Sequence, residues 1–86
     1  MYKIILSRGA EKFLVNLQKV DLRLFNQFIR ALNEISKNPY CAKALVGNLK
    51  GYYSYRVREY RILFEIEKKK LFIYVEKIEH RKGAYR

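Results

Sequence analysis

The stretch LKGYYSYRVREYRILFEIE, residues Leu49–Glu67, decides the fold because apolar and polar residues alternate along it in two runs. Alternation with a period of two is typical of β-strands that bury one face. The alternation breaks near Glu59, and this break predicts a hairpin. Its predicted buried face consists of Tyr53, Tyr55, Val57, Tyr60, Ile62, Phe64 and Ile66.

The apolar residues of both strands must lie on the same face of this hairpin. Only a turn with an even number of residues allows this, because a shift of one residue moves all side chains of a strand to the opposite face. Such a turn places Arg56 directly opposite Arg61 on the other face. Like charges in that arrangement repel each other, so the pair predicts an anion-binding site. The predicted pairs on the buried face are Val57 with Tyr60, Tyr55 with Ile62 and Tyr53 with Phe64.

Before the hairpin the sequence predicts one strand over residues 2–6 and two helices. Ser7 is a suitable N-cap for a helix over about 8–19, and Asp21 for a second, longer helix. Apolar residues recur along both at intervals of three and four. Pro39 ends the second helix, because a proline disfavours the helical conformation in the residue before it.

After the hairpin, residues 71–78 predict a last strand, and a two-residue turn would pair Ile66 with Leu71, Phe64 with Ile73 and Ile62 with Val75. The order is β-α-α-β-β-β. We therefore predict a single α+β domain over residues 1–86, with two N-terminal helices on one face of a small antiparallel sheet.

The composition favours a folded, cytoplasmic protein with a polyanionic partner. Nineteen Lys and Arg residues against eight Asp and Glu give a net charge of +11 on 86 residues. Such a surface suits nucleic acid first, an anionic membrane second and an acidic protein third. The lone Cys41 fits a reducing compartment. No apolar run is long enough to span a bilayer, and we expect no signal peptide in this sequence.

Side chains that can bind phosphate are predicted to converge at one end of the sheet. Arginine forks hold phosphate oxygens in a bidentate manner, and Tyr52 beside them offers a platform for stacking a base. The alternative is a solvated basic face. The sequence has neither a metal-ligand cluster nor a glycine-rich phosphate loop, so no metal or other cofactor is expected. The converging residues are Arg56, Arg58, Arg61, His80, Arg81 and Tyr85.

The sequence resembles the RelE/ParE superfamily of toxins from toxin–antitoxin pairs, in particular its RelE-like ribonuclease branch. The resemblance covers essentially the whole chain and rests on the order of four segments. They are Leu49-Lys50-Gly51, Tyr55-Arg56-Val57-Arg58, Tyr60-Arg61-Ile62-Leu63-Phe64-Glu65-Ile66 and His80-Arg81-Lys82-Gly83-Ala84-Tyr85-Arg86.

The resemblance implies a basic toxin that enters the ribosomal A site, cuts mRNA without a metal and is neutralised by an acidic antitoxin. Arg61 would stabilise the transition state, Arg81 would be an acid or a phosphate contact, and Tyr85 would be a candidate base. His80 is a further candidate, because other members use a histidine near this point and an imidazole suits proton transfer near neutrality. Residues expected to bind RNA are Lys50, Tyr52, Arg56, Arg58, Lys82 and Arg86.

Two other functions remain open at this point. A ParE-like toxin would inhibit DNA gyrase by binding, although that branch usually lacks the arginine–tyrosine set of the tail. A module that binds RNA or a protein partner without catalysis would show RNA affinity that weakens with salt but no cleavage.

Overall fold

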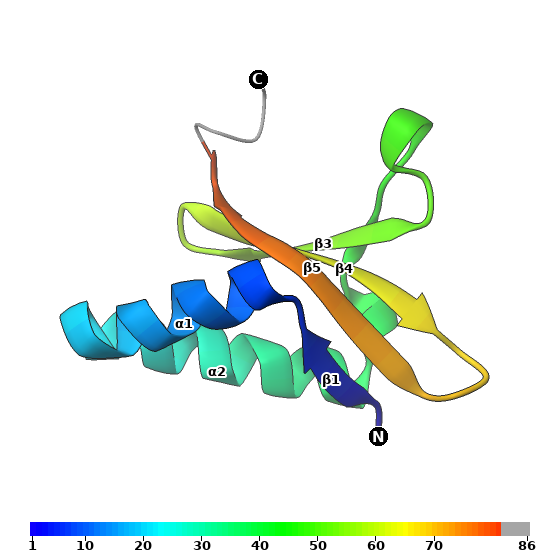
Figure 1. Cartoon of the computed structure of the whole chain (residues 1–86). Coiled ribbons are helices and arrows are strands. Elements are labelled where there is room, and N and C mark those ends of the chain that lie inside the picture. The colour runs from blue at the N-terminus through cyan, green and yellow to red at the C-terminus, as the bar shows by residue number, and fades with distance from the viewer. Residues whose placement is uncertain (82–86) are drawn as a thin grey trace.

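The computed structural model describes residues 1–81, in which two α-helices lie against one five-stranded sheet (Figure 1). None of the helices in this part of the chain is both long and apolar enough to cross a membrane. The elements are β1 (Lys3–Leu6), α1 (Arg8–Val20), α2 (Leu22–Lys37), the 3-10 turn η1 (Pro39–Cys41), β2 (Lys43–Ala44), the 3-10 turn η2 (Gly47–Leu49), β3 (Tyr52–Val57), β4 (Tyr60–Glu67) and β5 (Phe72–His80).

The strand order in the sheet is β1-β5-β4-β3-β2. The α+β class and the placement of both helices on one face are confirmed, but the sheet is mixed, because β1 runs parallel to β5. The sequence pattern leaves this direction open, since nearly the whole chain separates the two strands and no hairpin turn ties them. The short edge strand β2 was not predicted either, because residues 43–44 are too few to show a period.

The two predicted helix caps are confirmed. The Oγ atom of Ser7 accepts a hydrogen bond from the N–H of Ala10 at 3.1 Å, and Asp21 Oδ1 accepts one from the N–H of Leu24 at 3.1 Å. The Ser7 hydroxyl also donates to the carbonyl oxygen of Glu76 at 2.6 Å, which ties the start of α1 to β5. The caps therefore satisfy backbone donors that a helix start leaves unpaired.

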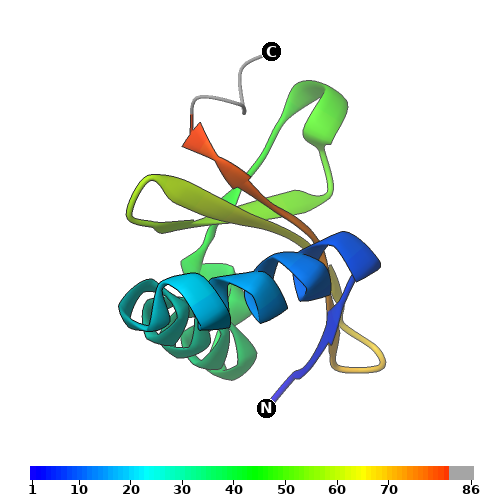
Figure 2. The same cartoon turned by 60° about the vertical axis from the view of Figure 1, so that its left-hand side comes forward.

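Both helices lie on one side of the sheet (Figure 2), and the hydrophobic core lies between the helices and the sheet. Phe28 of α2 and Phe64 of β4 are fully buried in it. The rings of Phe13, Phe28 and Tyr60 pack together with centroids 5.5–5.7 Å apart. Within residues 1–81, no α-helix covers the opposite face of the sheet, which we call the helix-free face.

The register of the β3–β4 hairpin agrees with the prediction at every position. Val57 pairs with Tyr60 and Arg56 pairs with Arg61 across a two-residue turn. Period-two patterning fixes a register of this kind because any odd slip would expose the buried set to water. The other predicted pairs, Tyr55 with Ile62 and Tyr53 with Phe64, are also present.

The predicted β4–β5 register is wrong by two residues. Ile66 pairs with Ile73 and Phe64 with Val75, because the turn is longer than predicted and Leu71 adopts a left-handed conformation with φ of 57°. A shift by two preserves the buried face, so the hydrophobic pattern could not reveal it.

A β-bulge in this ladder changes which face the end of β5 presents. The register shifts between Leu63 and Phe64, whose partners are Lys77 and Val75 respectively, so Glu76 is the extra residue. Beyond the bulge, Ile78 returns to the core side, where it packs against the buried cluster. The bulge thereby places Glu79 on the helix-free face, directly opposite Arg61.

Candidate functional site

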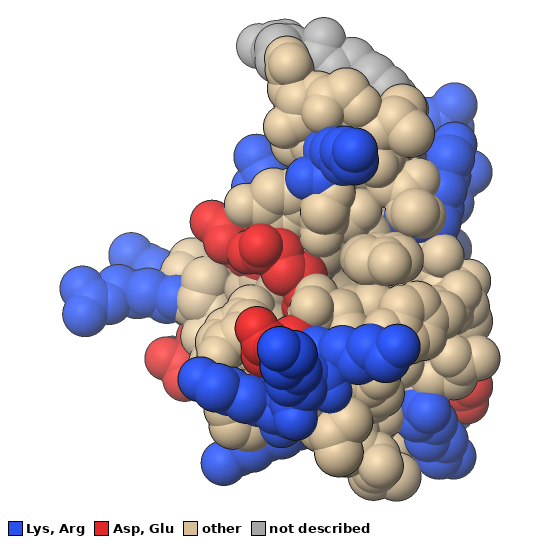
Figure 3. Space-filling view, turned by 90° about the vertical axis from the view of Figure 1, so that its right-hand side faces the viewer, with Lys and Arg blue, Asp and Glu red and all other residues tan. Residues whose placement is uncertain are grey.

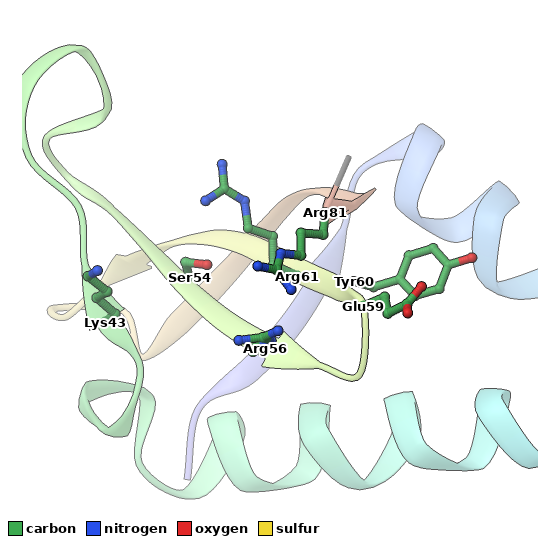
Figure 4. Close-up of a pocket in the computed structure, with 7 residues that line it drawn as sticks. All are labelled: Lys43, Ser54, Arg56, Glu59, Tyr60, Arg61 and Arg81. Atoms are coloured by element: carbon green, nitrogen blue, oxygen red, sulfur yellow. The ribbon is translucent and has the colours of Figure 1, made fainter. Parts of the chain in front are cut away.

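A pocket of about 250 Å³ lies on the helix-free face of the sheet, near the β3–β4 turn. Among residues 1–81, four basic residues line it, three of them from β2, β3 and β4 and the fourth, Arg81, from directly after β5, as Figure 4 shows. The lining residues are Lys43, Ser54, Arg56, Glu59, Tyr60, Arg61 and Arg81. We call this hollow the cationic pocket.

Arg56 and Arg61 face each other across the β3–β4 ladder, as the sequence predicts, and each is held by a further contact. The Nε–H of Arg56 donates to the carbonyl oxygen of Arg58 at 3.1 Å. Arg61 contacts a single oxygen of Glu79, Oε1, through Nε and Nη2, each at 3.1 Å. The Glu79 carboxylate therefore offsets part of the repulsion between the two arginines.

Arg81 enters the cationic pocket because the backbone joins the end of β5 to the hairpin turn. The N–H of Arg81 donates to the carbonyl oxygen of Glu59 at 2.6 Å. On the other side, Lys43 of β2 pairs with Ser54 of β3 and also lines the cationic pocket. Among the described lining residues, the four cationic ones outnumber Glu59, whose carboxylate contacts His80, so the pocket is suited to an anion.

Arg56, Arg61 and Arg81 thus line one pocket, as the sequence predicts. The roles assigned to these arginines remain predictions. His80 does not line the cationic pocket. Its ring packs edge-on against Tyr60 with centroids 5.0 Å apart, and its Nε2 lies 3.3 Å from Glu59 Oε2. His80 therefore touches two residues that do line it.

Arg58 departs from the expectation that it converges with Arg56 and Arg61 at one end of the sheet. It occupies the first position of the two-residue turn with φ of 56°, and its neighbours in space are residues of α2. Of the two central residues of the turn, only the first has a positive φ. This pattern is that of a type II′ turn, in which the first central residue is most often glycine. The turn thus directs Arg58 toward the helices.

The remaining predicted residues lie elsewhere. Lys50 follows η2 and is exposed, and Tyr52 pairs with Glu65 at the start of β3, so neither lines the cationic pocket. The negative charge of Glu65, followed by that of Glu76 and by partial burial, raises the pKa of Tyr52 above its ordinary value. Tyr85, Lys82 and Arg86 lie outside the described residues.

Sequence reasoning missed the residues Lys43, Ser54, Glu59 and Glu79. Ser54 shares a predicted strand face with Arg56, and this alternation could have identified it. Glu79 could not be found in this way, because its orientation depends on the bulge. Lys43 depends on the pairing of a two-residue strand.

The charge of the chain is unevenly spread over the surface. Figure 3 shows acidic side chains gathered in one area with Lys and Arg around them. Strands β4 and β5 together carry four carboxylates, those of Glu65, Glu67, Glu76 and Glu79. Within residues 1–81, no group of three or more His, Cys, Asp and Glu side chains is placed to hold a metal ion.

Comparison with known proteins identifies the family. Residues 4–85 match the family model described as the ParE toxin of the type II toxin-antitoxin system parDE. No curated protein gives a significant sequence match.

Several solved structures share the fold at low sequence identity. A YoeB/ParE toxin from Agrobacterium tumefaciens superposes with a TM-score of 0.81 and 17% identity over 91% of this chain and 96% of that one. The RelBE2 toxin-antitoxin complex from Mycobacterium tuberculosis gives 0.77 and 24% identity over 93% and 98%. The intact E. coli RelBE complex gives 0.74 and 19% identity over the full length of both chains. Because the family match spans almost the entire sequence, this chain belongs to the ParE/RelE family and is a toxin of a type II toxin–antitoxin system.

Proposed function

We propose that this toxin is an endoribonuclease that cuts mRNA in the ribosomal A site without a metal ion. The observation that carries the proposal is the cationic pocket, in which Arg61 and Arg81 meet beside the opposed Arg56. The apposition of two arginines across a ladder is unfavourable in the free protein. A phosphodiester bound between the two arginines would neutralise their charges, so removal of the repulsion would add to the binding energy.

The reaction that fits this pocket uses the substrate's own ribose. The 2′-oxygen attacks the adjacent phosphorus, the bond from phosphorus to the 5′-oxygen breaks, and the products are a 2′,3′-cyclic phosphate and a 5′-hydroxyl. The phosphate gains negative charge on the way to the transition state. Arg61 and Arg81 would bind its non-bridging oxygens, and one well-placed donor of this kind contributes about 3 kcal/mol. Holding the attacking and leaving oxygens in line supplies a further part of the acceleration.

Two protons move in this reaction: one leaves the 2′-hydroxyl and one reaches the 5′-oxygen. The sequence supplies three candidates for these transfers, namely His80, Arg81 and Tyr85. Glu59, which lines the cationic pocket, is a further candidate, and its carboxylate oxygen Oε2 lies 3.3 Å from Nε2 of His80. A carboxylate that is held by a histidine can accept the 2′-proton.

The cognate partner is an antitoxin. Solved relatives include complexes of RelB with RelE and of YefM with YoeB. We propose that the antitoxin of this chain is acidic, since the toxin carries a net charge of +11. Binding would cover the cationic pocket in the cytoplasm until the antitoxin is lost.

Purified toxin added to ribosomes programmed with a defined mRNA tests the proposal, with primer extension as the measurement. The parent protein should cut the message, and Arg61→Ala should reduce the rate by about 100-fold. Lys12→Ala, which removes one exposed positive charge from α1, is the matched control and should cut normally. If Arg61→Ala cuts as well as the parent, the cationic pocket is not the active site.

The family match itself favours a second candidate, because the matching family is named for ParE. A ParE-like toxin would inhibit DNA gyrase by binding. Gyrase supercoiling, measured with the same protein preparations, separates the two functions. Inhibition of supercoiling without cleavage on ribosomes would replace the ribonuclease proposal. Salt-sensitive RNA binding with neither activity would identify a non-catalytic binding module.

A further inference from the structure

A second basic hollow, with a volume of about 290 Å³, lies between α2 and the end of β3. We call it the α2 groove. Gln27, Arg30 and Glu34 line it from the helix, and Arg56 and Arg58 line it from the hairpin. Since Arg56 lines both this groove and the cationic pocket, the two hollows are adjacent.

The backbone of the hairpin turn brings the Arg58 side chain into the α2 groove. Arg58 has φ of 56°, a left-handed conformation that a residue with a side chain adopts at an energetic cost and that glycine adopts freely. Strained positions of this kind concentrate at functional sites. Here the strained residue carries a cation that lies against α2, on the helix side of the sheet.

The charge of the α2 groove is not balanced within the described chain. Three arginines share it with the single carboxylate of Glu34, and no ion pair within residues 1–81 joins Arg30, Arg56 or Arg58 to an acidic side chain. The hydrogen bond of Arg56 to the Arg58 carbonyl oxygen uses only its Nε–H. The terminal nitrogens of the arginines can therefore bind an anion.

Gln27 provides an independent sign of a ligand. Its Oε1 atom is buried and has no hydrogen-bond partner in the described part of the chain. Buried polar atoms nearly always have a partner, so each exception calls for an explanation. An occupant that donates a hydrogen bond here would satisfy this acceptor.

We propose that the α2 groove binds the nucleotide of single-stranded RNA next to the one held in the cationic pocket. The guanidinium groups of Arg30 and Arg58 bind its phosphate, and Gln27 Oε1 accepts a hydrogen bond from a ribose hydroxyl or a base amino group. An acidic peptide would also neutralise the arginines. RNA is favoured because Arg56 belongs to both hollows, so one regularly charged backbone can pass from one to the other. The inference rests on the proposed function in taking RNA as the substrate.

Two variants test the groove without endangering the fold. Arg58→Gly removes the cation and also the strain at the turn, and Gln27→Met removes a buried unpaired acceptor while keeping the side-chain length. Both variants should therefore be at least as stable to heat as the parent. Weaker RNA binding by either of them cannot then be attributed to unfolding.

The measurement is fluorescence anisotropy with an unstructured oligoribonucleotide, without ribosomes, as a function of salt. Arg58→Gly should weaken binding by about fivefold and lower the magnitude of the salt slope by about 0.7, the change for one lost phosphate contact on a single strand. Gln27→Met should weaken binding without changing the slope, because it removes a hydrogen bond and no charge. Lys69→Gln removes the same charge from the turn at the far end of β4 and should leave the slope unchanged.

The outcomes separate this inference from the proposed function. If Arg58→Gly affects RNA binding no more than Lys69→Gln, the inference is wrong. It is also wrong if Arg58→Gly binds RNA normally but loses affinity for a polyglutamate peptide, because the groove then holds an acidic chain. A parent protein that shows the expected binding pattern but does not cut ribosome-bound mRNA overturns only the ribonuclease proposal.

Discussion

Arg61 on β4 lies between Glu79 and Arg56. Its guanidinium group forms an ion pair with the carboxylate of Glu79 on β5, and Arg56 on β3 is its partner in the β3–β4 ladder. Both members of the ion pair are largely buried, with 21% of the Arg61 side chain and 18% of the Glu79 side chain exposed. Only one edge of the guanidinium, Nε and Nη2, contacts Glu79. Glu79 can therefore orient Arg61 and keep the repulsion from Arg56 small.

Replacing this carboxylate should move stability and RNA affinity in opposite directions. Glu79→Gln should lower the free energy of unfolding by about 1 kcal/mol, because a partly buried charge-assisted hydrogen bond is lost and the arginines repel more strongly. It should also tighten RNA binding, because the pocket gains net positive charge. Thermal denaturation and anisotropy measure the two effects.

Glu65→Gln is the matched control for this change, since Glu65 lies on the same strand face as Arg61 but pairs with Tyr52. It alters the net charge equally. If both variants show the same loss of stability, the contact with Arg61 does not explain the effect of Glu79.

A second prediction concerns the turn between β4 and β5. Leu71 has φ of 57° and its side chain is 48% exposed. A residue other than glycine in this conformation is strained by roughly 1 kcal/mol. Leu71→Gly should therefore raise the midpoint of thermal unfolding, whereas the β-branched Leu71→Val should lower it. Equal midpoints for the two variants would contradict a strained turn.

Alternation of residue types could predict the hairpin but not everything attached to it. The alternation with a period of two predicts that Arg56 and Arg61 lie opposite each other, because a register shift by an odd number of residues would expose Phe64 and Ile62. The same pattern is blind to a shift by two, which is why the β4–β5 register was predicted wrongly. The bulge at Glu76 adds one residue and reverses the faces beyond it. For this reason Glu79 was not recognised as a partner of Arg61.

Arg58 illustrates a different limit of sequence reasoning. Strand periodicity would keep it on the face of Arg56, but the turn takes it out of the strand and into a left-handed conformation. Dihedral angles of turns depend on loop length and on the twist of both strands. A pattern of apolar and polar residues carries no information about them.

The pKa of Tyr52 gives a prediction about alkaline pH. The carboxylate of Glu65 is the largest cause that raises this pKa above the usual value of about 10. The folded protein thus retains the phenolic proton at a pH where the unfolded chain has lost it. The stability from this difference is complete below about pH 10 and is lost as the pH rises through the folded pKa.

Glu65→Gln should lower the pKa of Tyr52 toward its usual value. Ultraviolet difference titration of the phenolate, with Tyr52→Phe to identify the signal, measures the change. The titration curve of the Tyr52 signal should move to lower pH in Glu65→Gln. An unmoved curve would mean that Glu65 does not control this tyrosine.

The last prediction concerns the opposed arginines themselves. Arg56→Gln removes the like charge opposite Arg61 and leaves a side chain of similar reach. It should raise the free energy of unfolding by up to about 0.5 kcal/mol, since like charges across a ladder are destabilising. It should also weaken RNA binding by about tenfold, because Arg56 lines both the cationic pocket and the α2 groove. A variant that becomes less stable would contradict this prediction and would mean that the hydrogen bond of Arg56 to the Arg58 carbonyl oxygen outweighs the repulsion. A stabilised variant with weaker binding would mean that the toxin keeps the unfavourable pair for the anion that it binds.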